Sequence, residues 1–205
     1  MIFTIVVLIL SVIVHEVAHG YAAHALGDPT AKLAGRLTLN PLPHIDPIGS
    51  VLLPAILVAT NAGILFGWAK PVPYNPYNLK NQRWGEAIVG IAGVATNLFI
   101  AVVFALIART AFSMEQETFA SLAATVSLVN LFLGLFNLIP IPPLDGFTVL
   151  RGILPYRFSL PLRRFEEGLV GGGVFTLLIF LFVFSYFFAD TFYAFVLTVF
   201  KLLVG

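Results

Sequence analysis

Long apolar runs separated by short polar connections dominate the sequence. Continuous hydrophobic stretches cover residues 2–26, 48–68, 87–108, 119–139 and 169–188. Each of them approaches the roughly 20 residues that a helix needs to cross a bilayer. The pattern therefore predicts an all-α polytopic membrane protein with about five transmembrane or re-entrant helices.

The connections between these runs differ in character. Residues 27–47 are polar and rich in Gly and Pro, and they include the β-compatible stretch 37–39, so we expect short β-like segments between the first helices. Residues 70–76 contain three prolines, which favour extended backbone. Asp190 interrupts the last apolar region, and we expect residues 191–204 to lie in the membrane interface or partly to return.

The composition supports a membrane location. Hydrophobic residues make up 59% of the 205 positions and charged residues 10%, whereas soluble domains carry about 25% charged residues. The chain has no cysteine, which excludes disulfides, Cys-ligated zinc and a thiol nucleophile. The chemistry must come from His, carboxylate and hydroxyl groups. The formal charge of +1 gives no indication of nucleic-acid binding, and we expect no nucleic-acid partner.

An H-E-x-x-H motif, His15-Glu16-Val17-Ala18-His19, lies inside the first apolar run. On a helix its two histidines lie one turn apart on one face and can share a zinc ion. Glu16 beside them is a candidate general base. A charge inside a bilayer costs roughly 2.5–3.5 kcal/mol on insertion scales, so this glutamate needs a partner or a function. The alternative interpretation is a buried His–Glu pair that holds two helices together.

A third zinc ligand must come from elsewhere, because catalytic zinc usually has three protein ligands. His24 lies about 180° around the helix from His15. Other acidic residues lie in polar connections or beside apolar runs: Asp28, Asp46, Glu86, Glu115, Glu117, Glu166, Glu167 and Asp190. Asp145 instead lies within a proline-rich, apolar, non-helical stretch, residues 140–146, that caps an apolar run. Irregular backbone at that depth is tolerated only when buried in protein or lining a wet cavity, so we expect Asp145 to be the third ligand.

Three segments together resemble the intramembrane site-2 metalloprotease family. That family pairs H-E-x-x-H on one helix with an N-x-x-P-x-P-x-x-D-G segment on another, and the latter matches Asn137 to Gly146. Its small-residue G-x-x-x-N segment, on the helix between, matches Gly93 to Asn97. The matches follow the family's order along residues 15–146.

The resemblance implies a role for each matched residue. His15, His19 and Asp145 would hold one Zn²⁺ per chain, and Glu16 would be the general base. Asn97 and Asn137 would help to hold the substrate or the developing oxyanion. For Asn97 a polar contact between helices is an equally good interpretation.

The function implied by the resemblance is zinc-dependent endopeptidase activity within or near the transmembrane segments of other membrane proteins. Its partners would be a transmembrane protein or peptide substrate and the lipid bilayer. The chain resembles a compact form of the family, without a peptide-binding insert in residues 27–85 and without a regulatory tail domain. Two alternatives are a metal-ion carrier, which would more typically show paired repeats, and an inactive relative that binds other membrane proteins.

The predicted metal site constrains the topology. If every apolar run crossed the membrane, His19 and Asp145 would approach opposite faces. The conflict disappears if residues 48–68 enter and return on the same side, which their proline and glycine residues permit. Nine of the eleven basic residues then share one side, which the positive-inside rule makes cytoplasmic. We expect a prokaryotic plasma membrane.

We interpret the chain as one integral membrane domain, residues 1–205. Its parts are the metal helix (1–26), a connection with the re-entrant segment (27–85), core helices with the third ligand (86–146), and a basic loop with a tail helix (147–205). The start carries no basic segment or cleavage motif, so we expect a retained helix. The extended segment 68–77 is either a simple connector or a strand that pairs with substrate.

Overall fold

The computed structural model describes residues 2–59, 68–171 and 173–205, and within these ranges the regular structure is entirely helical. Three helices are long and apolar enough to cross a membrane: α1 (Ile2–Ala25), α4 (Gly85–Ser113) and α5 (Glu117–Asn137). They confirm the predicted first, third and fourth apolar runs. The chain is therefore a helical membrane protein.

Shorter elements connect and flank these three helices. They are α2 (Thr30–Leu33), a 3₁₀ turn (Leu42–His44), a π-helical turn (Pro47–Leu52), α3 (Leu53–Ala59), a second 3₁₀ turn (Pro76–Asn78), α6 (Asp145–Ile153), α7 (Tyr156–Gly171), α8 (Gly173–Phe187) and α9 (Ala189–Val204). The expected β-like segments are not confirmed in the described residues. At residues 37–39 the Thr38 carbonyl accepts a bond from the His44 side chain at 2.9 Å rather than from a strand.

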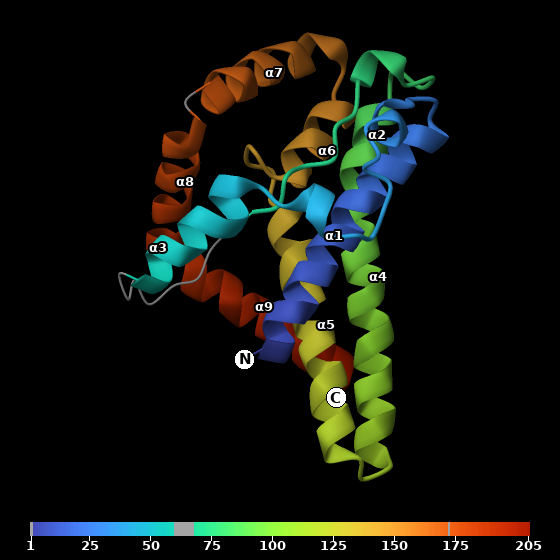
Figure 1. Ribbon diagram of the computed structural model, residues 1–205, viewed down its shortest axis with the longest axis vertical. Helices are drawn as coiled ribbons and strands as arrows, with labels where there is room; N and C mark the ends of the chain where they lie inside the picture. The colour runs from blue at the N-terminus through green and yellow to red at the C-terminus, as the bar shows by residue number, and fades with distance from the viewer. Residues whose placement is uncertain (1, 60–67, 172) are drawn as a thin grey trace.

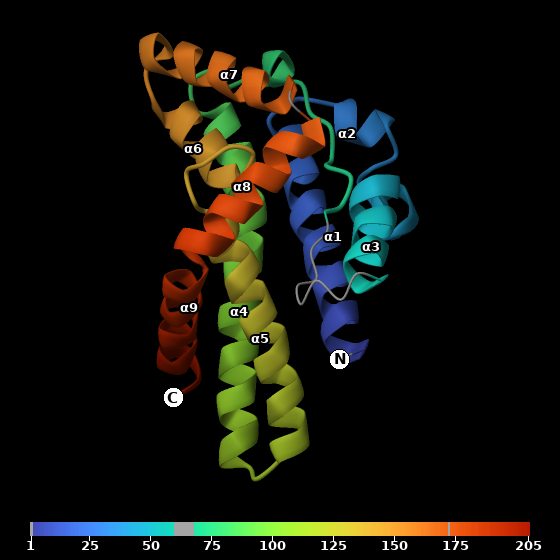
Figure 2. The ribbon, with the colours of Figure 1, turned by 90° about the vertical axis from the view of Figure 1, so that its left-hand side faces the viewer.

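The core is an antiparallel pair, α4 and α5, with α1 packed against both (Figures 1 and 2). Small residues at helical spacing let these helices approach closely: Ala101, Ala105 and Ala108 on α4 are fully buried. On α5, a Cβ at Gly134 would lie 2.8 Å from the Leu98 side chain. Close packing of small residues is how helices associate in lipid, where the hydrophobic effect does not drive them together.

The two ends of the predicted re-entrant segment lie beside each other. The Trp68 amide donates to the Gly49 carbonyl at 3.2 Å, and the Ser50 hydroxyl donates to the Trp68 carbonyl at 2.8 Å. A single crossing would separate these ends by about 30 Å. The two ends therefore lie at one depth, which a re-entrant topology requires. Its middle, residues 60–67, lies outside the described residues.

The C-terminal part differs from the prediction. The expected span 169–188 is not confirmed: α8 has 15 residues, about 22 Å of helix, which is less than the hydrocarbon thickness of about 30 Å. The following helix is not merely interfacial. Figure 2 shows α9 alongside the α4–α5 pair, and Val196 is fully buried against Ala101 and Leu131.

The predicted basic loop is a helix, α7, which lies across one end of the upright helices (Figure 1). Two acidic residues and two arginines hold it in place, and we name them the ion-pair cluster. Arg151 of α6 pairs with Glu86 of α4 at 2.9 Å and with Glu166 of α7, and Arg163 of α7 also pairs with Glu86. The alternating charges explain why an arginine-rich stretch folds here.

Candidate metal centre

The H-E-x-x-H motif lies on the buried stripe of α1. Residues Val7, Ser11, His15, His19 and Ala23 recur every fourth position and are all buried. This spacing directs both histidines into the bundle, towards α4. The apolar residues around them supply the remaining helix surface, much of which is exposed and suited to lipid.

Asp145 lies beside the two histidines, although it is distant from them in the sequence. It is the first residue of α6, so it stands at a helix start rather than within the irregular stretch where it was predicted. After α5 the backbone turns through residues 138–144 and brings α6 back against the end of α5. Gly146 permits this return, because a Cβ there would collide with the Leu138 and Ile139 carbonyls.

Three ligand-type atoms converge in this arrangement. The Asp145 Oδ2 atom lies 2.8 Å from His15 Nε2 and 3.3 Å from His19 Nε2, and the two Nε2 atoms are 3.0 Å apart. Two imidazole nitrogens and one carboxylate oxygen are the ligand types of catalytic zinc. At zinc–ligand distances of about 2.0–2.1 Å, tetrahedral ligands lie about 3.3 Å from one another. The observed separations are close to this value.

The surroundings of the three atoms also fit a metal ion. His15 Nδ1 is buried without a hydrogen bond to any described residue, and Asp145 Oδ2 is buried with only the two imidazole nitrogens beside it. Gly93 of α4 leaves room for the imidazoles, because a Cβ there would lie 2.5 Å from His19 Nε2 and 2.7 Å from His15 Nε2. The carboxylate of Asp145 must be ionised to bind a metal, and the two imidazole nitrogens beside it favour the charged form.

The orientation of His19 is fixed by α4. Its Nδ1 donates to the Val89 carbonyl at 2.7 Å. A donor at Nδ1 leaves the lone pair of Nε2 free to bind a metal, which is the usual arrangement around metal-binding histidines. Sequence reasoning did not find this backbone acceptor, because no residue type marks it.

Glu16 borders the same cavity, which measures about 190 Å³. Its Oε2 accepts a hydrogen bond from the Val72 amide at 2.8 Å. Val72 belongs to the extended segment 68–77, so this segment lies against the site. Strand pairing with a substrate would require such a position. The contact with Val72 was not predicted, since it joins residues 56 positions apart.

The hydrogen-bond donors of the segment limit how it could pair with a substrate strand. The Lys70 amide donates to the His44 carbonyl, the Val72 amide to Glu16 and the Asn75 amide to Asp28. Residues 71, 73 and 76 are prolines and have no amide hydrogen. Few donors therefore remain for an added strand.

The two predicted asparagines occupy different places. Asn137 lines the cavity together with the converging ligand atoms. Asn97 is 0% exposed within the bundle, does not line the cavity, and neither of its side-chain polar atoms has a described partner. The structure therefore brings Asn137, but not Asn97, to the cavity surface.

Asp28 has a structural role that sequence reasoning missed. Its carboxylate accepts bonds from the Thr30 amide and hydroxyl, the Asn75 amide and the Asn78 side chain. It thereby ties the end of α1 to the loop that carries Val72. The pair Asp28 and Thr30, just after an apolar helix, is a local turn signal that could have indicated this role.

The fold and the converging side chains together define a helical membrane protein with a metal site of the metalloprotease type. A family model, Peptidase family M50, matches residues 109–180, which include the Asn137–Gly146 segment but not the H-E-x-x-H helix. The Bacillus subtilis protein YwhC is 43% identical over 160 residues, which cover 75% of this chain and 69% of YwhC.

Two further relatives extend the likeness. Rip2 of Mycolicibacterium smegmatis is 32% identical over 142 residues, covering 69% of this chain and 53% of Rip2. MJ0392 of Methanocaldococcus jannaschii is 28% identical over 193 residues, covering 87% of this chain and 46% of that protein. All three relatives carry "zinc metalloprotease" in their names. No solved structure was found to match the chain.

This chain belongs to peptidase family M50, the site-2 protease family. It is a metalloprotease, and its cofactor is Zn²⁺. The resemblance predicted from these segments is thus confirmed at the level of the family and the metal.

Proposed function

We propose that this chain is an intramembrane endopeptidase that cuts peptide bonds within or near the transmembrane segments of other membrane proteins. The observation that carries the proposal is the convergence of His15, His19 and Asp145 within 3.3 Å of one another among apolar helices. Glu16 borders the same cavity. A site at this depth serves substrates that are themselves in the membrane.

His15, His19 and Asp145 would hold the zinc ion. When bound, zinc polarises the scissile carbonyl and lowers the pKa of the attacking water. The Val89 carbonyl keeps the ring of His19 in one tautomer and orientation. The ionised Asp145 adds the negative charge that an otherwise neutral pair of imidazoles lacks. The three side chains thereby supply the charge and the geometry that the cation needs.

Glu16 would act as general base. Its carboxylate would accept a proton from the attacking water and later pass that proton to the leaving amine. The bond from the Val72 amide directs one carboxylate oxygen, Oε2, towards the extended segment. No described residue donates a hydrogen bond to the other oxygen, so the carboxylate is held at Oε2 and would exchange a proton at Oε1.

The substrate must present an unwound backbone, because a helical peptide carbonyl is hydrogen-bonded and shielded in lipid. We propose that the cavity between Asn137 and the segment 71–74 receives this backbone. Asn137 would offer an amide to the substrate, whereas Asn97 would act within the bundle. Because few donors of the extended segment are free, side-chain contacts would contribute more to binding than strand pairing does.

The proposed setting is the plasma membrane of a prokaryote, with the basic end of the bundle facing the cytoplasm. The arginines of α7 and the polar connection after α1 lie at that end (Figure 1). The positive-inside rule supports this orientation. Substrates would approach laterally through the bilayer.

One experiment tests the proposal directly. Purified wild type and Glu16→Gln would be placed in proteoliposomes with a library of transmembrane peptides, and cleavage and bound zinc would both be measured. We expect Glu16→Gln to retain zinc and to lose at least about 100-fold in cleavage rate, the usual contribution of a general base. Glu117→Gln, at the exposed start of α5, is the matched control and should cleave normally. Undiminished cleavage by Glu16→Gln would exclude Glu16 as the general base. Zinc flux without cleavage would indicate a metal-ion carrier.

A further inference from the structure

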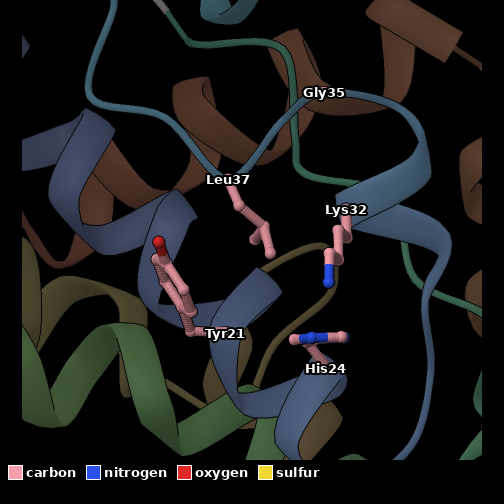
Figure 3. A pocket seen from close by; sticks show the side chains of 5 residues that line it. All are labelled: Tyr21, His24, Lys32, Gly35 and Leu37. Atoms are coloured by element: carbon pink, nitrogen blue, oxygen red, sulfur yellow. The ribbon is translucent and has the colours of Figure 1, made fainter.

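A second pocket, of about 360 Å³, lies at the polar end of α1, apart from the metal centre (Figure 3). Its lining comes from α1, α2 and the turn that follows α2: Tyr21, His24, Lys32, Gly35 and Leu37. None of these residues lines the metal cavity. A Cβ at Gly35 would meet nothing within 4 Å, so the pocket is open on that side.

The polar groups of this pocket suit an anion. The Lys32 ammonium group points towards the His24 ring in Figure 3. Lys32 forms no ion pair with any described residue, and His24 Nδ1 is buried without a described partner. The lining contains no acidic side chain. Asp28, four positions before Lys32, forms no ion pair with it; the Asp28 carboxylate instead accepts bonds from Thr30, Asn75 and Asn78.

The position of the pocket along α1 indicates the depth of its ligand. Tyr21 lies 19 residues after Ile2, about 28 Å along the helix axis, close to the hydrocarbon thickness of about 30 Å. Lipid headgroups lie at this level, and tyrosine is common there. Tyr21 is 55% exposed, and Leu33 on α2 is 82% exposed. Apolar surface thus borders the cationic groups, as an amphiphilic ligand would require.

We propose that this pocket binds a phosphate-bearing anion, supplied by the headgroup of an anionic phospholipid. Lys32 and His24 would contact the phosphate oxygens. Tyr21 and Leu37 would contact the glycerol and the upper acyl chains. The lipid would join α2 to α1 at the end of the helix that carries His15 and His19. A free inorganic phosphate has the same oxygen chemistry, but it lacks the apolar part that the exposed side chains would cover.

Native mass spectrometry of the full chain, released from nanodiscs that contain phosphatidylglycerol, measures this binding. We expect wild type to retain the lipid, and Lys32→Gln to lower its apparent affinity about fivefold, the usual effect of one basic residue near an anionic surface. His24→Leu should also lower it. Lys80→Gln is the matched control, because the Lys80 amide bonds to the Leu26 carbonyl at the same end of α1 but its side chain lies outside the pocket. It should bind as wild type does.

Two results would overturn the site. Equal retention by wild type and Lys32→Gln would exclude it, and an equal loss in Lys80→Gln would show general attraction to a basic surface. A second titration uses inorganic phosphate with the chain in neutral phosphatidylcholine nanodiscs. Weak or absent phosphate binding supports the lipid. Phosphate binding as strong as that of phosphatidylglycerol, and lost in Lys32→Gln, would overturn the lipid as the source. Lys32 is exposed, so its substitution should leave the fold intact.

Discussion

The helix α6 carries a different polar cluster at each end. At its first residue, Asp145 meets two imidazoles through Oδ2, and Nδ1 of His15 has no hydrogen-bond partner in the described residues. In its last turn, Arg151 meets Glu86 and Glu166, and each carboxylate faces a guanidinium. The first cluster gathers acceptors around one point, whereas the second alternates opposite charges.

This difference separates a binding site from a structural contact. A group of converging acceptors is incomplete without a cation, so its geometry indicates a ligand. A cluster of alternating charges is satisfied within the protein, so it indicates a contact that fixes α4, α6 and α7 to one another. Substitution of Asp145 should therefore reduce zinc affinity, whereas substitution of Arg151 should reduce the free energy of unfolding.

The largest effect on metal binding is expected at Asp145. Asp145→Ala should weaken zinc binding by more than about 100-fold, beyond the usual cost of losing an indirect partner of a metal ligand, and cleavage should disappear with it. Zinc content after dialysis against a chelator measures the first effect. Asp190→Ala, an exposed acid at the start of α9, is the control. Retention of zinc by Asp145→Ala would exclude this carboxylate as a ligand.

The ion-pair cluster should respond to Arg151→Met with lost stability. Removing the guanidinium leaves Glu86 and Glu166 together without a shared cation, and breaking a buried pair in this way costs about 3–5 kcal/mol. Unfolding of the detergent-solubilised protein measures the change. Zinc affinity of the folded fraction should remain that of wild type. Arg157→Met removes an exposed arginine at the start of α7 and should have little effect; an equal loss in both variants would contradict the assignment.

A smaller and more selective effect is expected at Gly93. Gly93→Ala would place a methyl group 2.5–2.7 Å from the two Nε2 atoms, so one ring must move. We expect zinc affinity to fall about tenfold, comparable with the loss of an orienting contact, while helix packing is largely kept. Gly168→Ala is the control, because a Cβ there meets nothing within 4 Å. Unchanged zinc affinity in Gly93→Ala would show that the imidazoles do not depend on this gap.

The smallest effect is expected at Glu166, and it depends on pH. Burial raises the pKa of Glu166, aided by Glu86 and opposed by Arg151. Folding therefore favours the protonated acid, so this group adds stability below its unfolded pKa of about 4.3 and loses it as pH rises through the folded value. Acidification from pH 7.5 to pH 5 should stabilise wild type relative to Glu166→Gln. Thermal unfolding at pH 7.5 and pH 5 tests this; a pH-independent difference would contradict it.

Several features of the fold and the site could be predicted because local patterns carry them. Apolar run length located the three spanning helices, and residue types with fixed spacing located His15, Glu16 and His19. Elimination among the acids identified Asp145, which the structure places beside both imidazoles. Family membership and zinc followed from the same residues. The re-entrant topology was inferred from the need to bring these segments together.

Other features depend on partners far along the chain, so no local pattern indicated them. The contact between Glu16 and the Val72 amide and the bond from His19 to the Val89 carbonyl involve backbone groups, which every residue has. The stretch predicted as a basic loop is the helix α7, because the ion-pair cluster connects its charged residues to α4 and α6. For residues 169–188 apolar composition alone suggested a span, and for residues 191–204 it suggested an interfacial or returning segment, whereas the helix boundary at Phe188 and the packing of Val196 depend on tertiary contacts.

The glycines at both ends of α6 have a consequence for how this enzyme could diversify. Gly146 lies against the Leu138 and Ile139 carbonyls, and Gly152 against the Ala87 backbone. Close contact with the backbone of neighbouring segments, in addition to the ion pairs of Arg151, therefore determines where this nine-residue helix lies. Apolar residues on the outer surface of α6 could change with the identity of the substrate, while the position of the Asp145 carboxylate stayed constant. Catalytic geometry and substrate preference would then evolve as separate properties.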